Sequence, residues 1–391
     1  MVNKFKDVVI VSASRTPIGS YRGLLKDMRS DQLGSMVIKE VLKKSKFIGD
    51  EIDEVIMGQV LTAGSGQNPA RQAAINAGIP ISKPAHIINQ VCGSGLRAVI
   101  SGYQSIKLGE SSNIIAGGQE NMSISPHSIF YRDKNKITKD KLLDTMINDG
   151  LMDAFNNYHM GVTAENIANK FNISRQEQDE FAFNSQKKTE IAIIDNKFHD
   201  ELIKINHNNK IIVKDEHPRA GLKISDLEKL KTVFKENGTV TPGNSSGIND
   251  GAAALLLSSL EIAEKKSIDP LAKIVSWASV GVDPALMGLG PIGAVREAIK
   301  KANWSINEID LFEINEAFAA QSIAVINELG IDKNKVNVNG GAIALGHPIG
   351  ASGARILVTL IYEMKRQKKN KGCATLCIGG GMGIALCVER I

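Results

Sequence analysis

The sequence is poor in aromatic residues and has no long apolar segment. Aromatic side chains make up 5% of its 391 residues. The longest apolar runs, at 8–11 and 252–257, are far shorter than the roughly 18 residues that a membrane-spanning helix needs. The net charge is only +5, and the basic residues are spread along the chain. We therefore expect a globular protein with no membrane segment and no nucleic-acid partner.

Targeting signals and common catalytic motifs are also missing. The first residues show neither a secretory nor a transit pattern, and the last four are not a peroxisomal signal. A cytoplasmic location is expected, with the four cysteines as thiols. No Walker A, His-Glu-x-x-His or Gly-x-Ser-x-Gly motif occurs. The spacing of Cys373, Cys377 and Cys387 does not match a zinc ribbon, so no metal site is predicted.

The chain instead repeats itself. Glu-Ile-Asp at 51–53 recurs at 308–310, and Ser-Gly-Leu-Arg at 94–97 resembles Ser-Gly-Ala-Arg at 352–355. The two offsets differ by one residue. Further matches relate 10–12 to 274–276 and 115–118 to 376–380. Several matches in the same order at nearly one offset predict two copies of one structural unit.

Each copy alternates short strand-like segments with helical ones, a pattern typical of an α/β fold with a mostly parallel sheet covered by helices. Strands are expected at 8–12, 54–58, 113–116, 272–276, 311–314 and 374–378, with returning strands at 251–257 and 383–387. The predicted domains are an N-terminal half at 1–121 plus 246–269, an inserted loop domain at 122–245, and a C-terminal half at 270–391. An insertion carried on loops above a sheet is a usual place for ligand binding.

Cys92 follows an extended segment and comes just before an apolar helical pattern that begins near Ser94. The free N–H groups and the dipole of a helix N-terminus favour a thiolate, which makes Cys92 a candidate nucleophile. The glycines around it allow a substrate carbonyl to approach the backbone. A small buried hydrophobic residue is the alternative interpretation of a single cysteine.

His347 lies in the matching turn of the second copy. By the repeat offset, Cys92 corresponds to Gly350, so His347 comes shortly before the equivalent helix. If the copies pack with these helices meeting centrally, His347 and Cys92 come together, and His347 is a candidate base. A structural histidine is the alternative, although a turn this rich in glycine has little apolar surface for it.

Two further segments suit the same chemistry. Cys377 ends a predicted strand and is followed by glycines whose N–H groups could hold a developing oxyanion. Asn315 and Glu316 follow another strand, where they could cap a helix. Alternatively, the side-chain amide of Asn315 could position a water or a carbonyl. Two thiols and a histidine at corresponding turns favour acyl transfer to or from carbon. Cys373 and Cys387 are expected to be packing residues.

Three long segments make the whole chain resemble the thiolase family: NQVCGSGLRAVISGYQSI at 89–106, NVNGGAIALGHPIGASG at 337–353 and ATLCIGGGMGIA at 374–385. The resemblance implies a thiolase-like α/β fold, in which two similar βαβαβαββ halves form a five-layered α/β/α/β/α core with an inserted loop domain. It also implies that coenzyme A thioesters are substrates and that no separate cofactor is needed.

The resemblance assigns a role to each reactive residue. Cys92 matches the cysteine that becomes acylated, and His347 matches the base that activates it. Cys377 matches the acid/base that exchanges the α-proton of the second acyl-CoA. Asn315 matches the residue that holds a water which, with His347, stabilises the enolate oxygen. The backbone N–H groups of Cys92 and Gly379 match the hole that binds the thioester oxygen.

The segment 159–161, His-Met-Gly, resembles the biosynthetic type, whose members use acetyl-CoA and acetoacetyl-CoA. The implied reaction is the reversible Claisen condensation of two acetyl-CoA to acetoacetyl-CoA plus CoA, through an acetyl-Cys92 intermediate. Residues 201–235 contain eight basic and five acidic residues, an excess that suits a phosphate-bearing ligand. The positions matched to the acyl pocket and the coenzyme A contacts are Leu151, His159, Met160, Arg219, Ser246, Met287, Ala317 and Phe318.

The resemblance further implies a homo-oligomer, a tetramer built from dimers, to which the loop at 125–141 would contribute. The alternative enzyme is a broad-range 3-ketoacyl-CoA thiolase of fatty-acid degradation, which chain-length preference would distinguish. An alternative of another class is an inert thiolase-fold protein that binds CoA or lipid. The intact Cys92, His347 and Cys377 argue against that alternative.

Overall fold

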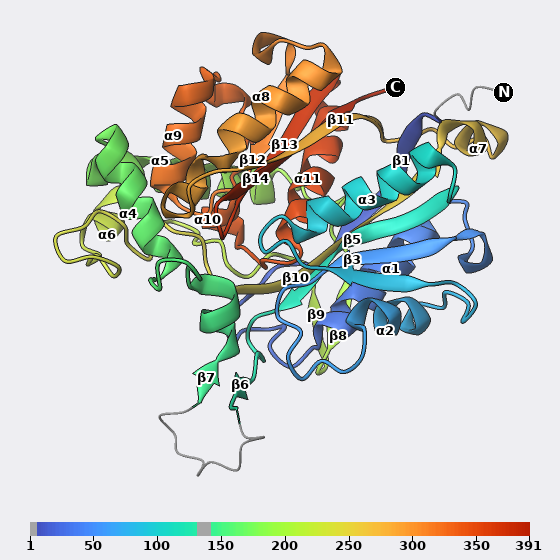
Figure 1. Ribbon diagram of the computed structural model, residues 1–391, viewed down its shortest axis with the longest axis horizontal. Helices are drawn as coiled ribbons and strands as arrows, with labels where there is room; N and C mark the ends of the chain where they lie inside the picture. The colour runs from blue at the N-terminus through green and yellow to red at the C-terminus, as the bar shows by residue number, and fades with distance from the viewer. Residues whose placement is uncertain (1–5, 131–141) are drawn as a thin grey trace.

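A computed structural model describes residues 6–130 and 142–391 (Figure 1). No helix within these two ranges is both long and apolar enough to cross a membrane. The first set of elements alternates strands and helices, and its last strand returns after a long excursion. These elements are β1 (Val8–Arg15), β2 (Gly19–Ser20), α1 (Ser30–Lys44), η1 (Gly49–Glu51), β3 (Glu54–Gly58), α2 (Pro69–Asn76), β4 (Ala85–Ile88), α3 (Ser94–Leu108), β5 (Asn113–Asn121) and β10 (Asn249–Ser259).

A second set of elements repeats this order after the connecting helix α7 (Leu260–Lys265). It consists of β11 (Ala272–Gly281), η4 (Pro284–Leu289), α8 (Gly290–Ala302), η5 (Ile306–Glu308), β12 (Leu311–Ile314), α9 (Ala319–Leu329), η6 (Lys333–Lys335), α10 (Ala342–Leu345), α11 (Ser352–Gln367), β13 (Lys371–Ile378) and β14 (Met382–Glu389). Where the first set has β4, the second has only a single bridge between Phe312 and Val336.

The strands of both sets join one ladder in the order β12-β13-β14-β11-β1-β10-β5-β3-β4. At its centre β1 pairs antiparallel with β11. The two sides of this junction have the same arrangement. In the first half the antiparallel strand β10 is followed by the parallel pair β5 and β3, and in the second half the antiparallel strand β14 is followed by the parallel pair β13 and β12. The repeat seen in the sequence is therefore present in the fold.

Apolar packing sorts the helices into layers. Helices α1 and α2 pack on the outer face of the first half, and α8 and α9 pack on the outer face of the second. Between them, α3 and α11 share one apolar cluster with strands from both halves. Helix, sheet, helix, sheet and helix follow one another, so the predicted five-layered α/β/α/β/α core is confirmed.

The central helices approach each other closely because both begin with small residues. A Cβ atom added to Gly95 would lie 2.8 Å from the backbone nitrogen of Ala354, which leaves no room for a side chain. Gly118, on β5, also has no room for a side chain, because the carbonyl of Gly350 lies against it. The starts of α3 and α11, which come just after Cys92 and His347, are thus held at the centre of the molecule.

The predicted strands were mostly too short. Those at 54–58 and 311–314 are correct, but β5 runs to Asn121 and β1 to Arg15. These extensions contain glycine and polar residues, which have a low strand propensity, yet they are buried and hydrogen-bonded to β10. Burial in a ladder outweighs local propensity here. The strand β4 was not among the predicted strands.

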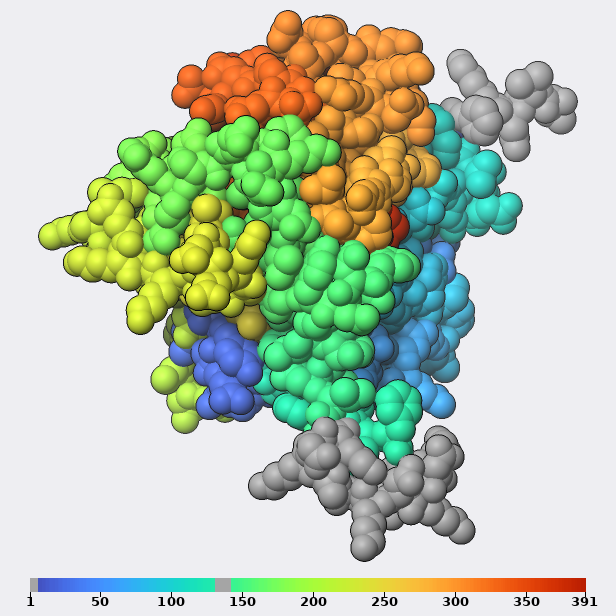
Figure 2. Space-filling view, turned by 60° about the vertical axis from the view of Figure 1, so that its left-hand side comes forward, coloured from blue at the N-terminus to red at the C-terminus, as the bar shows by residue number. Residues whose placement is uncertain are grey.

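The excursion between β5 and β10 consists mainly of helices and short hairpins. Its elements are β6 (His127–Ser128), β7 (Leu143–Asp144), η3 (Met146–Leu151), α4 (Met160–Phe171), α5 (Arg175–Ile194), β8 (Ile205–His207), β9 (Lys210–Ile212) and α6 (Ile224–Glu228). On the face in Figure 2 this green to yellow part lies between the blue first half and the orange second half. The predicted domain boundaries stay a prediction, and residues 131–141 of the oligomer loop lie outside the described residues.

Candidate active site

Cys92 lies in a tight turn just before α3. Val91 has a positive φ of 45°, which is strained for a β-branched residue. The hydroxyl of Ser94 holds the turn, since it donates to the carbonyl of Val91 at 2.7 Å and accepts from the N–H of Gln90 at 2.8 Å. This geometry presents Cys92 at the start of the helix, as predicted.

The thiol of Cys92 is nevertheless not predisposed to ionise. Burial raises its pKa to about 11, although N–H groups of Gly379 and of Cys92 itself act in the opposite direction. Helix N-terminal stabilisation of a thiolate, expected from the sequence, is outweighed by the loss of hydration. At neutral pH Cys92 is a thiol, and it needs a base to become a nucleophile.

His347 is held by hydrogen bonds at its backbone and at its ring. Its N–H donates to Asn249 Oδ1 at 2.9 Å, and its Nδ1 lies 2.6 Å from the hydroxyl of Ser352. That hydroxyl donates its only hydrogen to the carbonyl of Pro348 at 2.9 Å, so it accepts from Nδ1. The other nitrogen, Nε2, lies 3.5 Å from Nδ2 of Asn315 and carries no hydrogen.

Burial also keeps the ring of His347 neutral. Its pKa is lowered to about 3, first by loss of hydration and then by the positive charge of Arg355. A neutral ring with an unprotonated Nε2 is able to accept a proton at physiological pH. The structure therefore holds His347 in the form that a base requires.

Cys377 lies behind the pocket rather than on its wall. It is fully buried near the end of β13, in an apolar cluster with Met160, Met287 and Phe318. Burial raises its pKa well above the usual range, and the nearby Cys92 raises it further. The two thiols thus come from different halves of the chain, and Cys92 lies close enough to influence the ionisation of Cys377.

Asn315 is also buried, and it does not cap a helix. Helix α9 begins at Ala319 with Phe318 at the cap position, so the helix-cap interpretation is wrong. The Oδ1 atom of Asn315 has no hydrogen-bond partner among the described residues, although it is buried. A buried amide oxygen without a partner leaves room for a water or a substrate group. Glu316 is used structurally, since it accepts from Ser185 and Asn337.

A cavity of about 410 Å³ leads from the surface to Cys92 and His347. It brings together most of the residues predicted for the site. The predicted residues on its wall are Cys92, Leu151, His159, Met160, Arg219, Ser246, Met287, Ala317, Phe318, His347 and Gly379. Cys377 and Asn315 are not on the wall, which is consistent with their burial behind it.

The end of the insertion and the adjoining start of the returning segment contact the second half directly beside this cavity. Ser246 donates its N–H to the carbonyl of Ala317 at 3.0 Å, and the neighbouring Ser245 forms a bridge with Phe318. Ile248 forms a parallel bridge with His347. The acyl end of the cavity is therefore built jointly by segments that are far apart in the sequence.

Several wall residues were missed by the sequence analysis. Phe234 stacks on His159 with ring centroids 4.6 Å apart, and its ring is perpendicular to that of Phe318 at 6.3 Å. His217 lines the cavity beside Arg219, and burial lowers its pKa to about 4. The basic excess at 201–235 was the only signal for this segment. It pointed to the region but not to these side chains.

Within the described ranges, no group of three or more His, Cys, Asp and Glu side chains could hold a metal ion. Cys373 and Cys387 are buried and lie opposite each other on β13 and β14, in the core of the second half. They are packing residues, as predicted.

Comparisons with known proteins agree with this geometry. Residues 8–261 match the N-terminal domain of thiolase, and residues 268–390 match its C-terminal domain. The acetyl-CoA acetyltransferase of Rhizobium meliloti is 54% identical over 388 residues, covering 98% of this chain and 99% of that protein. The cytosolic acetyl-CoA acetyltransferase of Rattus norvegicus is 51% identical over 389 residues, covering 98% of each.

Solved structures show the same similarity. The acetyl-CoA acetyltransferase of Bacillus anthracis superimposes with a TM-score of 0.97 at 43% identity, covering 100% of both chains. Human mitochondrial 3-ketoacyl-CoA thiolase in complex with CoA superimposes with a TM-score of 0.96 at 39% identity, covering 99% of this chain and 98% of that one. This chain belongs to the thiolase family.

Proposed function

We propose that the protein is an acetyl-CoA C-acetyltransferase, which condenses two acetyl-CoA to acetoacetyl-CoA and CoA and also catalyses the reverse reaction. The observation that carries the proposal is the convergence of Cys92 and His347 on one cavity, with Cys377 buried directly behind it. Near full-length relatives named acetyl-CoA acetyltransferase support this reaction. The substrates are coenzyme A thioesters, and the residues present require no separate cofactor for this chemistry.

The first stage transfers an acetyl group to Cys92. The sulfur attacks the thioester carbonyl while its proton passes to Nε2 of His347, the nitrogen that is free to accept it. The N–H groups of Cys92 and Gly379 stabilise the developing oxyanion, and one such donor is worth about 3 kcal/mol. The C–S bond to coenzyme A breaks, and acetyl-Cys92 remains.

The leaving coenzyme A thiolate needs a proton, and Cys377 needs to lose one. Because burial raises the pKa of Cys377, it is a thiol in the free enzyme and cannot act directly as a base. Transfer of its proton to the leaving thiolate releases CoA and produces the thiolate of Cys377. Both requirements are met by one proton transfer.

The second stage forms the carbon–carbon bond. The thiolate of Cys377 removes an α-proton from a second acetyl-CoA, and a water held by the unpartnered Oδ1 of Asn315 stabilises the enolate oxygen together with His347. The enolate carbon attacks acetyl-Cys92, whose C–S bond breaks. Cys92 takes back the proton from His347, so all three groups return to their starting states.

The acyl end of the cavity suits a short chain. Met160, Met287 and Phe318 form one apolar cluster there, and Leu151 closes the cavity from η3. Toward the surface, Arg219 and His217 suit the coenzyme A portion of the substrate. A broad-range thiolase would instead need a tunnel for a long acyl tail.

A homo-oligomer and a cytoplasmic location complete the proposal. β4 is the last strand of its sheet, and an exposed strand edge is a ready site for pairing with another chain. A tetramer built from such dimers remains our proposal. The name of the rat relative, which includes the word cytosolic, supports the location.

Two measurements test the proposed reaction. Mass spectrometry after incubation with acetyl-CoA should find acetyl on Cys92 and on no other cysteine, and acetyl on Cys377 would reverse the assigned roles. Thiolysis rates across 3-ketoacyl-CoA substrates of increasing length should be highest for acetoacetyl-CoA. A rate that holds level to long chains would favour the degradative thiolase. The absence of turnover with every substrate would favour an inert binding protein.

A further inference from the structure

A second cavity, of about 320 Å³, lies in the insertion and shares no lining residue with the active-site cavity. We propose that it binds a small apolar carboxylate, such as a medium-chain fatty acid anion, and that residues 213–219 couple it to the active site. The binding part of the proposal does not depend on the proposed function. The coupling part rests on the active-site cavity being the coenzyme A site.

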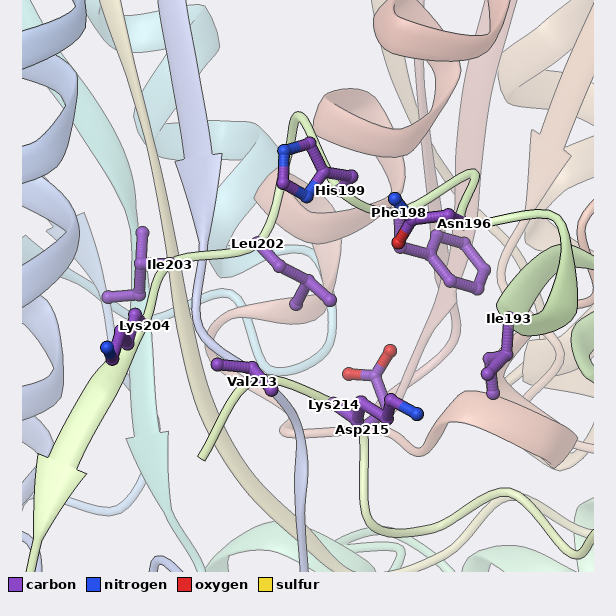
Figure 3. Close-up of a pocket in the computed structure, with 10 residues that line it drawn as sticks. All are labelled: Ile193, Asn196, Phe198, His199, Leu202, Ile203, Lys204, Val213, Lys214 and Asp215. Carbon is purple, nitrogen blue, oxygen red and sulfur yellow. The ribbon is translucent and has the colours of Figure 1, made fainter. Parts of the chain in front are cut away.

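The walls of this cavity are mostly hydrocarbon. Figure 3 shows its ten lining residues around a central opening, with Ile193 and Phe198 on one side and Ile203 on the other. Leu202 and Val213 complete the apolar surface. The volume is at the lower end of the range that small-molecule sites occupy, roughly 300–1,000 Å³. The walls therefore suit a short hydrocarbon chain.

The single carboxylate on the lining, Asp215, is already hydrogen-bonded within the protein. Asp215 accepts two hydrogen bonds from Arg15, at 2.7 and 3.0 Å, and a third from the N–H of Ile18 at 2.9 Å. Arg15 is fully buried and also forms an ion pair with Glu201 at 2.6 Å. Both oxygens of Asp215 are therefore taken up by protein donors, although Arg15 balances only one of its two carboxylate partners.

The rim, in contrast, carries uncompensated positive charge. Lys204 and Lys214 line the cavity, and neither forms an ion pair with any residue in 6–130 or 142–391. His199 and Asn196 add hydrogen-bond donors to the same rim. Two lysines without an ion-pair partner among the described residues, next to apolar walls, match an anion with a hydrocarbon tail. They do not match a cation or a strongly polar ligand.

The cavity is preformed by packing beneath it. Arg15 stacks on the ring of Phe198 at 5.2 Å, and the N–H of Arg15 donates to the carbonyl of Glu201 at 2.8 Å. Ile203 in turn donates its N–H to the carbonyl of Arg15 at 2.9 Å. These contacts fasten the 198–203 segment to the end of β1. The entropic cost of ordering this part of the site on ligand binding is therefore small.

One short segment, residues 213–219, contributes lining residues to both cavities. Asp215 lines the second cavity, while His217 and Arg219 line the active-site cavity. Between them Glu216 accepts from the N–H groups of Ser20 and Leu24, at 2.8 and 2.9 Å. A ligand that shifts 213–215 also shifts the adjoining His217 and Arg219, so binding at one cavity should change the affinity of the other.

The test uses octanoate as the probe and isothermal titration calorimetry of the whole protein. Octanoate should bind saturably, and the uncharged octanamide should bind more weakly. Lys214→Glu places a negative charge on the rim and should weaken octanoate binding about fivefold or more, the upper range for an exposed ion pair. Lys210→Glu makes the same charge change on β9 outside the lining and should leave binding unchanged.

Saturating CoA separates the two cavities. Octanoate should still bind to the CoA-saturated protein, and each ligand should change the affinity for the other by the same factor. Loss of octanoate binding in the presence of CoA, with no effect of Lys214→Glu, would place octanoate in the active site and overturn the proposal. No saturable binding at all would also overturn it. Binding that depends on Lys214 but is independent of CoA would support the site and reject the coupling. None of these binding outcomes depends on whether turnover is observed.

Discussion

At the scale of single residues, burial decides the protonation state of the reactive groups. Cys92 and Cys377 are thiols because burial raises the pKa of each, and His347 is a neutral ring because burial lowers its pKa. Opposite shifts follow from one cause, since loss of hydration always disfavours the charged form. These three reactive groups are therefore uncharged at rest, and charge forms on them only during the reaction.

The pH dependence of alkylation tests this resting state. Only the thiolate reacts with iodoacetamide, and the pKa of Cys92 is about 11. We expect its alkylation rate to rise about tenfold per pH unit from pH 6 to 9, followed by mass spectrometry of the modified peptide. Cys92→Ser is the control for reaction at other thiols. A rate that levels off below pH 8 would indicate a thiolate–imidazolium pair instead.

Deuterium exchange isolates the role of Cys377. Cys377→Ala should still form acetyl-Cys92, although more slowly because CoA must leave without a proton from Cys377. Exchange of the α-hydrogens of acetyl-CoA with deuterated solvent should fall at least about 100-fold, because the carbon base is gone. Cys373→Ala removes another buried thiol from the same strand and should keep its exchange rate. Full exchange in Cys377→Ala would assign the base to another residue.

At the scale of elements, the N-terminus of α4 shapes the acyl pocket. His159 caps this helix by accepting from the N–H of Gly161 at 3.0 Å, and Met160 is the first residue in the helix. Stacking of Phe234 on His159 holds the cap in place. A helix end fixed in this way keeps the side chain of Met160 against the cavity as a rigid wall.

Opening this wall should change the chain-length preference. The rate of the unmodified protein should fall steeply beyond about four to six carbons, because a closed pocket penalises a longer tail. Met160→Ala should flatten the profile, since each methylene admitted to apolar space contributes up to about 0.8 kcal/mol, near fourfold in rate. Some loss of acetoacetyl-CoA turnover is expected. Met36→Ala, on α1 and away from the cavity, should keep the original profile.

At the scale of the whole molecule, one open edge stands out among the described strands. β4 pairs with β3 on one side only. The carbonyls of Pro84 and Ile88 accept from the N–H groups of Val55 and Gln59, on the β3 side. Because backbone groups of successive residues alternate in direction along a strand, the N–H and C=O groups of Ile87 face the open side. This edge is free to pair with a second copy of the chain.

The oligomer proposal is tested at this position. Analytical ultracentrifugation should show a dimer or larger assembly. Ile87→Pro removes an outward N–H group and should shift the protein toward the monomer, because proline is tolerated at a strand edge but cannot pair there. Ile87→Ala shortens the same side chain but keeps the N–H group, and it should assemble as before. A monomeric unmodified protein would disprove the homo-oligomer.

The sequence by itself determined the repeat, the fold class and the identity of Cys92, His347 and Cys377 as candidates. These depend on short-range signals, since strand patterns, helix starts and glycine-rich turns extend over a few residues. The repeat offset alone also related the Cys92 turn to the His347 turn. Strand lengths were less predictable, because buried glycine and polar residues in β1 and β5 follow the ladder rather than their own propensity.

Only the tertiary structure decided how those candidates work. The contacts of His347 with Asn249 and Asn315, and the entry of His217 and Phe234 into the cavity, join segments that no local pattern relates. The pKa of Cys92 was expected to fall and instead rises, because hydration depends on everything packed around the thiol. A sequence records which groups are available, whereas burial and long-range contacts set their charge and direction.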